Sequence, residues 1–181
     1  LASFNEMNPA MHISFDVTNR DGLIKQLENS EADIVLMGQP PENMNLITVA
    51  FMDNPLVVIA SPKHPLTTLD KPATLNQLLS HDFVLREPGS GTRMAMERFF
   101  NEHNKTLISN MEMNSNDAIK QSVETGLGLG VASIHTLEHE LREKRLKIIP
   151  AEGFPIRRSW YLVHRKDKRL SPLAEKFRFY A

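Results

Sequence analysis

The segment best suited to chemistry is "FVLREPGSGTR" at residues 83–93. A β-branched and aromatic run leads into a proline, two glycines and a serine, with Arg86 and Arg93 on either side. Glycine lets backbone approach a ligand closely, and guanidinium groups suit carboxylates and phosphates. The segment therefore predicts a loop that holds an anion. The alternative is a tight turn followed by an ordinary helix cap, and the pattern alone leaves both open.

Two further segments, "VTNRD" at 17–21 and "MNSND" at 113–117, also place Ser, Thr or Asn where a helix is expected to begin. Such side chains cap free N–H groups, and the helix dipole favours anions at the same end. In open α/β sheets, ligands bind at the carboxyl ends of strands, where these helix starts lie. The three junctions are candidate ligand contacts, with plain capping as the alternative.

Several segments resemble catalytic, nucleotide-binding or metal-binding motifs, but each lacks a residue or a spacing that its motif requires. "GSGTR" lacks the lysine and the spacing of a phosphate-binding loop. "GLGLG" at 126–130 follows a helix, and Val131 stands where a dinucleotide fingerprint needs glycine, so Gly126 is predicted to end a helix. "HTLEH" has Glu138 outside the zinc-protease position, and no Gly-x-Ser-x-Gly elbow occurs. The sequence predicts no catalytic residue, no metal site and no cofactor.

Composition narrows the class of protein. The chain has 181 residues, with 21 basic and 22 acidic side chains, whereas a nucleic-acid-binding module usually carries a basic excess. No apolar run approaches the roughly 20 residues that a membrane helix needs. Cysteine is absent, which excludes disulfides and thiolate sites and fits a reducing cytoplasm. We expect a cytoplasmic protein that contacts neither DNA nor membrane through this segment.

Strand and helix patterns alternate along the chain. An amphipathic helix tail precedes Pro9, "MHISFDV" at 11–17 alternates like a strand, and helical spacing follows from about residue 19. This alternation continues to a final helix that begins near Pro172. It predicts an α/β fold with a mostly parallel sheet. Since such domains normally open on a strand, we expect the chain to be a fragment that lacks at least one upstream strand.

Four segments resemble a known family in their order. They are "EADIVLMGQPPENMNL…NPLVVIASPKHPL", "FVLREPGSGTRMAMERFF", "SNDAIKQSVETGLGLGVAS" and "RRSWYLVHRKDKRLSPLAEKF". Together they look like the effector-binding domain of a LysR-type transcriptional regulator, closest to the CbbR-like regulators of carbon-fixation operons. The resemblance implies a type II periplasmic-binding-protein-like fold, with two Rossmann-like lobes joined by two crossover strands. Lobe I would be 1–61 plus 155–181 and lobe II 62–154, with the winged helix-turn-helix and the first effector-domain strand absent.

The resemblance also implies an effector site between the lobes. Its residues would be Thr18, Asn19, Arg20, Glu87, Pro88, Gly89, Ser90, Gly91, Thr92, Arg93, Asn116 and Phe154. The expected ligand is a small anionic metabolite, such as a phosphorylated sugar, a carboxylate or NADPH. Arg93 and the 88–93 loop are expected to hold its charged group.

Oligomers are implied in the same way. A homodimer or tetramer would pair through "MHISFDV" and "TRMAMERFFNEHN", with Met94, Met96 or Phe99 partly exposed before pairing. DNA would be bound only through the missing N-terminal domain. The alternatives are a solute-binding protein of a transporter, which shares the fold, and a small α/β enzyme, which would need an activated nucleophile.

Overall fold

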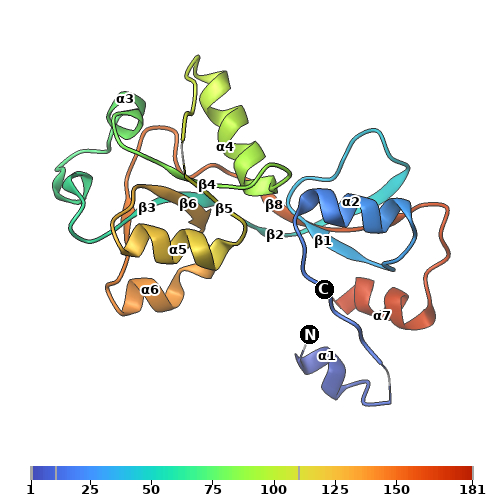
Figure 1. Cartoon of the computed structure of the whole chain (residues 1–181). Helices are drawn as coiled ribbons and strands as arrows, with labels where there is room; N and C mark the ends of the chain where they lie inside the picture. The colour runs from blue at the N-terminus through green and yellow to red at the C-terminus, as the bar shows by residue number, and fades with distance from the viewer. Residues whose placement is uncertain (1, 11, 110, 181) are drawn as a thin grey trace. The chain divides into compact units, whose positions relative to one another are not determined.

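The computed structural model describes residues 2–10, 12–109 and 111–180 (Figure 1). The chain divides into two compact units, which we call unit 1 (residues 1–52 with 159–181) and unit 2 (residues 53–158). The expected division lay at 61/62 and 154/155. It differs because the strand at 56–60 pairs with two strands of unit 2, which brings this strand into that unit.

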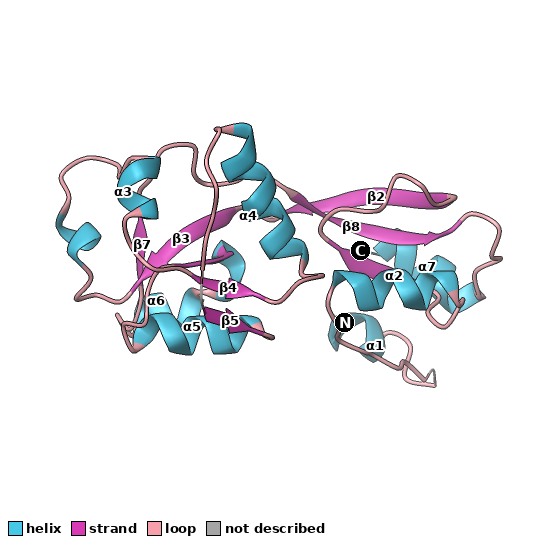
Figure 2. Cartoon of the chain, turned by 45° about the horizontal axis from the view of Figure 1, so that its top comes forward, coloured by secondary structure: helices cyan, strands magenta, loops and turns pink. Residues whose placement is uncertain are grey.

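Helices and strands alternate over most of the chain (Figure 2). The helices are α1 (Ala2–Glu6), α2 (Arg20–Glu28), α3 (Leu75–Leu79), α4 (Gly91–Glu102), α5 (Asn116–Glu124), α6 (Glu138–Arg142) and α7 (Pro172–Tyr180), with short 3-10 turns η1 (Pro65–Thr68) and η2 (Ile134–Thr136). The strands are β1 (Val35–Met37), β2 (Leu46–Asp53), β3 (Leu56–Ala60), β4 (Val84–Arg86), β5 (Met111–Met113), β6 (Gly130–Ser133), β7 (Lys147–Ile149) and β8 (Ser159–Arg165).

Unit 1 contains a three-stranded sheet in the order β1-β8-β2, in which β1 runs antiparallel to β8. Leu27 of α2 packs with Val35, Met37 and Val163 of these strands in one buried cluster. The terminal helices α1 and α7 also belong to this unit, where the ring of Phe4 lies 5.1 Å from that of Phe177.

The strand expected at 11–17 is not found. Residue 11 lies outside the described residues, and residues 12–17 form no strand. Phe15 and Val17 are 66% and 79% exposed. Alternation of apolar and polar residues indicates which face of a strand would be buried, but a strand also needs a hydrogen-bonded neighbour. Within the part of the chain that the structure describes, this segment has none.

Unit 2 contains a three-stranded sheet in the order β6-β3-β7 and a two-stranded sheet of β4 and β5. All five residues of β3 are buried, and β3 runs antiparallel to both neighbours. The strands β4 and β5, which α4 connects, pair in parallel. The expected mostly parallel sheet is therefore wrong for these ladders. A crossover helix dictates a parallel neighbour, whereas the irregular connector after β3 imposes no direction.

An ion pair joins α5 to α6 in unit 2. Lys120 Nζ lies 2.8 Å from Glu140 Oε1 and donates to the carbonyl of Thr136. Burial opposes ionisation of Glu140, but its hydrogen bond and charge contact with Lys120 outweigh this and hold its pKa below the usual range. Glu140 Oε2 is buried without a hydrogen-bond partner among the described residues.

Two histidines contact each other beside η1. The rings of His64 and His81 lie 4.6 Å apart, and His64 Nδ1 accepts a hydrogen bond from the N–H of Leu66. Burial and, secondly, the neighbouring His81 lower the pKa of His64. The neutral ring is the form that can accept this hydrogen bond, so the contact and the pKa shift favour the same state.

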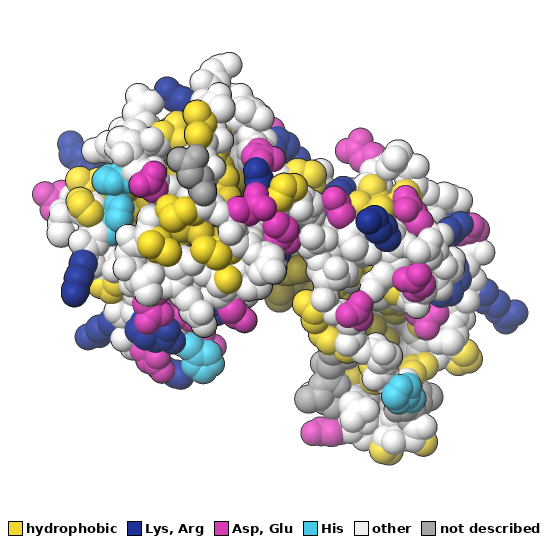
Figure 3. All heavy atoms as spheres, viewed as in Figure 1, with side chains coloured by type: hydrophobic (Ala, Val, Ile, Leu, Met, Phe, Trp, Pro, Cys, Tyr) yellow, Lys and Arg dark blue, Asp and Glu magenta, His cyan; other side chains and the backbone are white. Residues whose placement is uncertain are grey.

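Basic and acidic side chains are mixed on the face drawn in Figure 3, as the near-neutral composition predicts. None of the helices that the structure describes has the length and apolar character needed to cross a bilayer. Among the same residues, no group of three or more His, Cys, Asp or Glu side chains could hold a metal ion.

Candidate functional site

The predicted anion loop connects β4 to α4. Its chain reverses with Gly89 at a φ of +84°, a conformation that glycine adopts readily, and the N–H of Ser90 donates to the carbonyl of Glu87. Ser90 is buried, and its Oγ accepts from the N–H groups of Thr92 and Arg93 at 3.3 and 3.5 Å. The predicted cap of α4 is therefore confirmed. Both capping bonds are long, so the amino end of α4 keeps much of its attraction for an anion.

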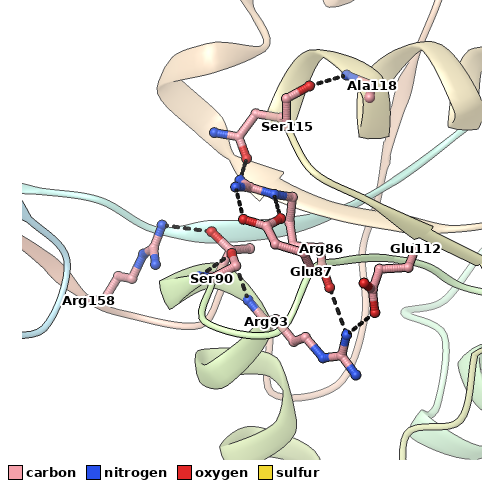
Figure 4. A network of polar contacts seen from close by, with 10 residues as sticks. Arg86, Glu87, Ser90, Arg93, Glu112, Ser115, Ala118 and Arg158 are labelled. Atoms are coloured by element: carbon pink, nitrogen blue, oxygen red, sulfur yellow. Dashed lines mark hydrogen bonds and ion pairs between the residues drawn. The ribbon is translucent and has the colours of Figure 1, made fainter. Parts of the chain in front are cut away.

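The loop is joined to the amino end of α5. Arg86 pairs with Glu87 through two hydrogen bonds of 2.7 and 3.0 Å, and it also donates to the side chain of Asn116, the first residue of α5 (Figure 4). The hydroxyl of Ser115 caps α5 by accepting from the N–H of Ala118. The third junction thus caps a helix as predicted. Arg86 brings this junction and the loop together and offsets the charge of Glu87.

Arg93, the residue expected to hold the effector, has protein partners instead. Its guanidinium lies 2.8 Å from Glu97 and 2.6 Å from Glu112, and it donates to the carbonyl of Arg86 at 3.0 Å. The hydrogen bond with Glu97 is the main cause of the raised pKa of Arg93. Figure 4 shows the guanidinium directed towards Glu112. Arg93 braces α4 against β4 and β5, and an effector anion would have to compete with two carboxylates for it.

Arg158, the last residue of unit 2, also contacts this loop, and the sequence analysis did not predict it. Its Nη2 donates to Thr92 Oγ1 at 3.4 Å, beside Ser90 in Figure 4. Its Nε donates to the carbonyl of Asn54 at 3.3 Å. Burial lowers the pKa of Arg158 to about 10. The available signal was the Arg157–Arg158 pair, which closely follows the expected crossover at Phe154. This side chain places a desolvated positive charge at the amino end of α4.

Phe154 is a packing residue of unit 2. Its ring lies 4.8 Å from the ring of Phe99 in α4, at an angle of 63°. This edge-to-face contact fixes the segment that leads to Arg158 against α4. The effector contact expected for Phe154 stays a prediction.

The residues expected from unit 1 organise the start of α2. Asn19 caps this helix by accepting from the N–H of Gly22, as predicted. Arg20 donates to the carbonyl of Gln39 and lies 3.9 Å from Asp21. A Cβ at position 22 would collide with the present position of the Thr18 side chain, so Thr18 would have to move to admit a larger residue. These contacts explain the local structure, and an effector role of Thr18, Asn19 and Arg20 stays a prediction.

Helix α4 was also expected to form part of the dimer surface. Met94 of α4 is 38% exposed, as predicted, whereas Met96 and Phe99 are buried in the core of unit 2. Of the three candidates Met94, Met96 and Phe99, Met94 is therefore the one that is partly exposed. Helical spacing places Met94 on a different face of α4 from these two residues.

Comparisons with known proteins agree with one another. The family described as the LysR substrate binding domain matches residues 1–181. The RuBisCO operon transcriptional regulator of Allochromatium vinosum is 51% identical over 178 residues, which cover 98% of this chain and 59% of the relative. The HTH-type transcriptional regulator CbbR of Xanthobacter flavus is 38% identical over 178 residues, which cover 97% of this chain and 53% of the relative.

One solved structure is similar over almost the whole chain. It is the regulatory domain of CcmR from Synechocystis PCC6803 in complex with 2-PG, with 36% identity and a TM-score of 0.93. The match covers 99% of this chain and 86% of that one. The chain spans 59% of the length of the Allochromatium relative.

Proposed function

Because the chain belongs to the LysR substrate-binding-domain family, we propose that it senses a small anionic metabolite for a regulator of carbon-fixation genes. The family has the type II periplasmic-binding-protein-like fold, and the named relatives are transcriptional regulators rather than enzymes or transport proteins. We place the charged group of the metabolite at the amino end of α4, within reach of Arg158, Thr92 and Ser90.

The observation that carries the placement is the position of the half-buried guanidinium of Arg158, whose Nη2 lies 3.4 Å from Thr92 Oγ1 in the first turn of α4. Partial burial disfavours the charged form of this group and lowers its pKa to about 10. An anion beside it would restore a favourable environment for that charge, and the α4 dipole acts on the anion in the same direction. Thr92 Oγ1 lies 3.4 Å from this guanidinium, so its hydroxyl is positioned to donate to the same anion.

The class of ligand follows from the loop and from the relative. Guanidinium groups and helix amino ends both suit phosphate and carboxylate groups. The CcmR domain, 36% identical to this chain, was solved in complex with 2-PG. We therefore propose 2-PG as the first effector to test, with phosphorylated sugars, carboxylates and NADPH as the other candidates.

Calorimetric titration of the full-length protein with this panel tests the proposal. Arg158→Met should weaken binding of the effector about ten- to a hundredfold, because a charge-assisted hydrogen bond contributes about 1.5–3 kcal/mol. Arg157→Met is the matched control, since Arg157 is exposed and its loss changes the net charge equally. Equal affinities of Arg158→Met and the wild type would contradict this placement. Absence of binding of every anion by the wild type would contradict the sensing function.

The rest of the proposal concerns the whole protein. We propose that it acts in the cytoplasm as a homodimer or tetramer and binds DNA through a helix-turn-helix outside this chain. The exposed Met94 of α4 and the exposed Phe15 and Val17 of the segment 12–17 support pairing of copies through these two segments. Sedimentation at rising concentration, for the wild type and for Met94→Glu, tests this pairing, since a monomeric wild type would contradict it.

Thr18→Val tests the proposed effector contacts of unit 1 separately, through its affinity for the same panel of anions.

A further inference from the structure

Arg158 lies at one of the two places where the chain passes from one unit to the other, at 52–53 and 158–159. Its backbone carbonyl accepts from the N–H of Asn54 at 2.7 Å, and its Nε donates to the carbonyl of Asn54 at 3.3 Å. Asn54 lies next to the other passage and is fully buried. One residue therefore links the segments adjacent to both passages.

The same guanidinium ends at α4. Its contacts with the Asn54 carbonyl and with Thr92 Oγ1 measure 3.3 and 3.4 Å. Both are longer than the usual N–H···O distance of about 2.9–3.0 Å, and hydrogen bonds weaken as they lengthen. Each of these two contacts is therefore weaker than a hydrogen bond of the usual length.

We infer that Arg158 couples anion binding at α4 to the rigidity of both passages. This inference rests on the proposed function. An anion held by the Nη groups and the α4 amino end adds a negative charge beside the half-buried guanidinium and fixes its plane. Nε is part of that rigid plane, so fixing one edge also fixes the direction of the bond to Asn54. The backbone pair of Asn54 and Arg158 then opens less often.

Lysine at this position separates binding from coupling. Its ammonium keeps the positive charge and can still attract the anion, but it is a single point without the planar fork. In this variant, an anion held at α4 therefore no longer fixes a hydrogen-bond donor to the Asn54 carbonyl, because lysine lacks the Nε that arginine provides. Arg158→Lys should bind 2-PG about tenfold more weakly than the wild type, yet without any effect of the ligand on residue 54.

Hydrogen–deuterium exchange on the full-length protein, with and without saturating 2-PG, provides the test. In the wild type, 2-PG should slow exchange of the Asn54 amide by about threefold or more, because that amide exchanges by local opening of its bond to Arg158. Arg158→Lys at saturating 2-PG should show no slowing, and Arg157→Met should respond like the wild type.

His135→Gln is a second control at the same passage. His135 Nε2 donates to the carbonyl of Asp53 at 2.9 Å, yet its hydrogen bond does not involve α4. This variant should change exchange near residue 54 in the absence of ligand and keep the slowing caused by 2-PG. If Arg158 had a purely structural role, Arg158→Lys would behave like His135→Gln. Both variants would then change exchange near residue 54 without ligand, and both would keep the slowing caused by 2-PG.

The outcomes are distinguishable. Tight 2-PG binding without slowing at Asn54, or slowing that persists in Arg158→Lys, overturns the coupling and leaves the proposed function standing. Failure of the wild type to bind any anion of the panel overturns both. Because the comparison of wild type with and without ligand needs no variant, poor folding of a variant does not block the test.

Discussion

Replacing Arg93 should reduce stability far more than it reduces effector binding. Arg93→Met removes contacts to Glu97 and Glu112, whose side chains are 45% and 50% exposed, and a hydrogen bond to the Arg86 carbonyl. Each half-exposed ion pair contributes about 0.2–1 kcal/mol. The carbonyl hydrogen bond adds about 1 kcal/mol. The free energy of unfolding should therefore fall by about 1–3 kcal/mol.

Urea unfolding and thermal melts measure this loss directly. For a chain of this size, each kcal/mol corresponds to a shift in Tm of about 2–4 °C. A double-mutant cycle with Glu112→Gln should give a coupling energy of about 0.2–1 kcal/mol that shrinks in high salt, because the pair is half exposed. Affinity of the folded variant for 2-PG should change by less than about threefold, since no contact made by Arg158 is removed.

The opposite pattern would refute the reasoning. An unchanged Tm, together with affinity for 2-PG reduced more than about tenfold, would show that Arg93 leaves its carboxylates to bind the ligand. Arg93 would then be the anion contact that the "GSGTR" pattern first suggested. Measuring Arg93→Met and Arg158→Met side by side decides between the two arginines.

Three further predictions concern stability. The folded protein has a lowered pKa at His64, so the unfolded chain binds more protons there as the pH falls below about 6.5. The free energy of unfolding should therefore be highest above that pH and should decrease as the pH falls through the folded pKa of His64. Urea titrations at several pH values should show a smaller decrease in His64→Asn. Gly128→Ala would place a Cβ 2.5 Å from a backbone carbonyl and should destabilise by about 1–3 kcal/mol, whereas Gly126→Ala, with open space around it, should lose only the smaller amount due to its φ of +89°. Lys120→Met should destabilise by about 3 kcal/mol by leaving buried Glu140 unpaired, and adding Glu140→Met should recover much of the loss in denaturant melts.

The starts of α2, α4 and α5 could be predicted because capping is local. Asn19, Ser90 and Ser115 each accept from an N–H two or three residues further along the chain. A side chain and its target that are so close in sequence are brought together by the turn itself. The helix end at Gly126 follows from the same kind of reasoning, because its positive φ suits glycine.

Strand pairing could not be predicted in this way. The apolar run of β3 indicates a buried strand, yet nothing within 56–60 indicates that β6, more than 70 residues later, runs antiparallel beside it. Residues 12–17 show the converse, because their alternation is clear and the described residues supply no neighbouring strand. Pairing is decided by distant segments, so local periodicity determines neither its direction nor its existence.

The difference between Arg93 and Arg158 has the same origin. In the sequence, Arg93 stands beside two glycines and Arg158 stands 65 residues away from it, so proximity favoured Arg93. Folding places Glu97 and Glu112 against Arg93 and places the half-buried Arg158 beside Thr92. The neighbours and the solvation of a charged side chain decide how it interacts with an anion, and neither is visible along the chain. A cation next to a glycine loop therefore indicates the region of a proposed anion site, while the folded contacts of each arginine decide which one we propose as the anion contact.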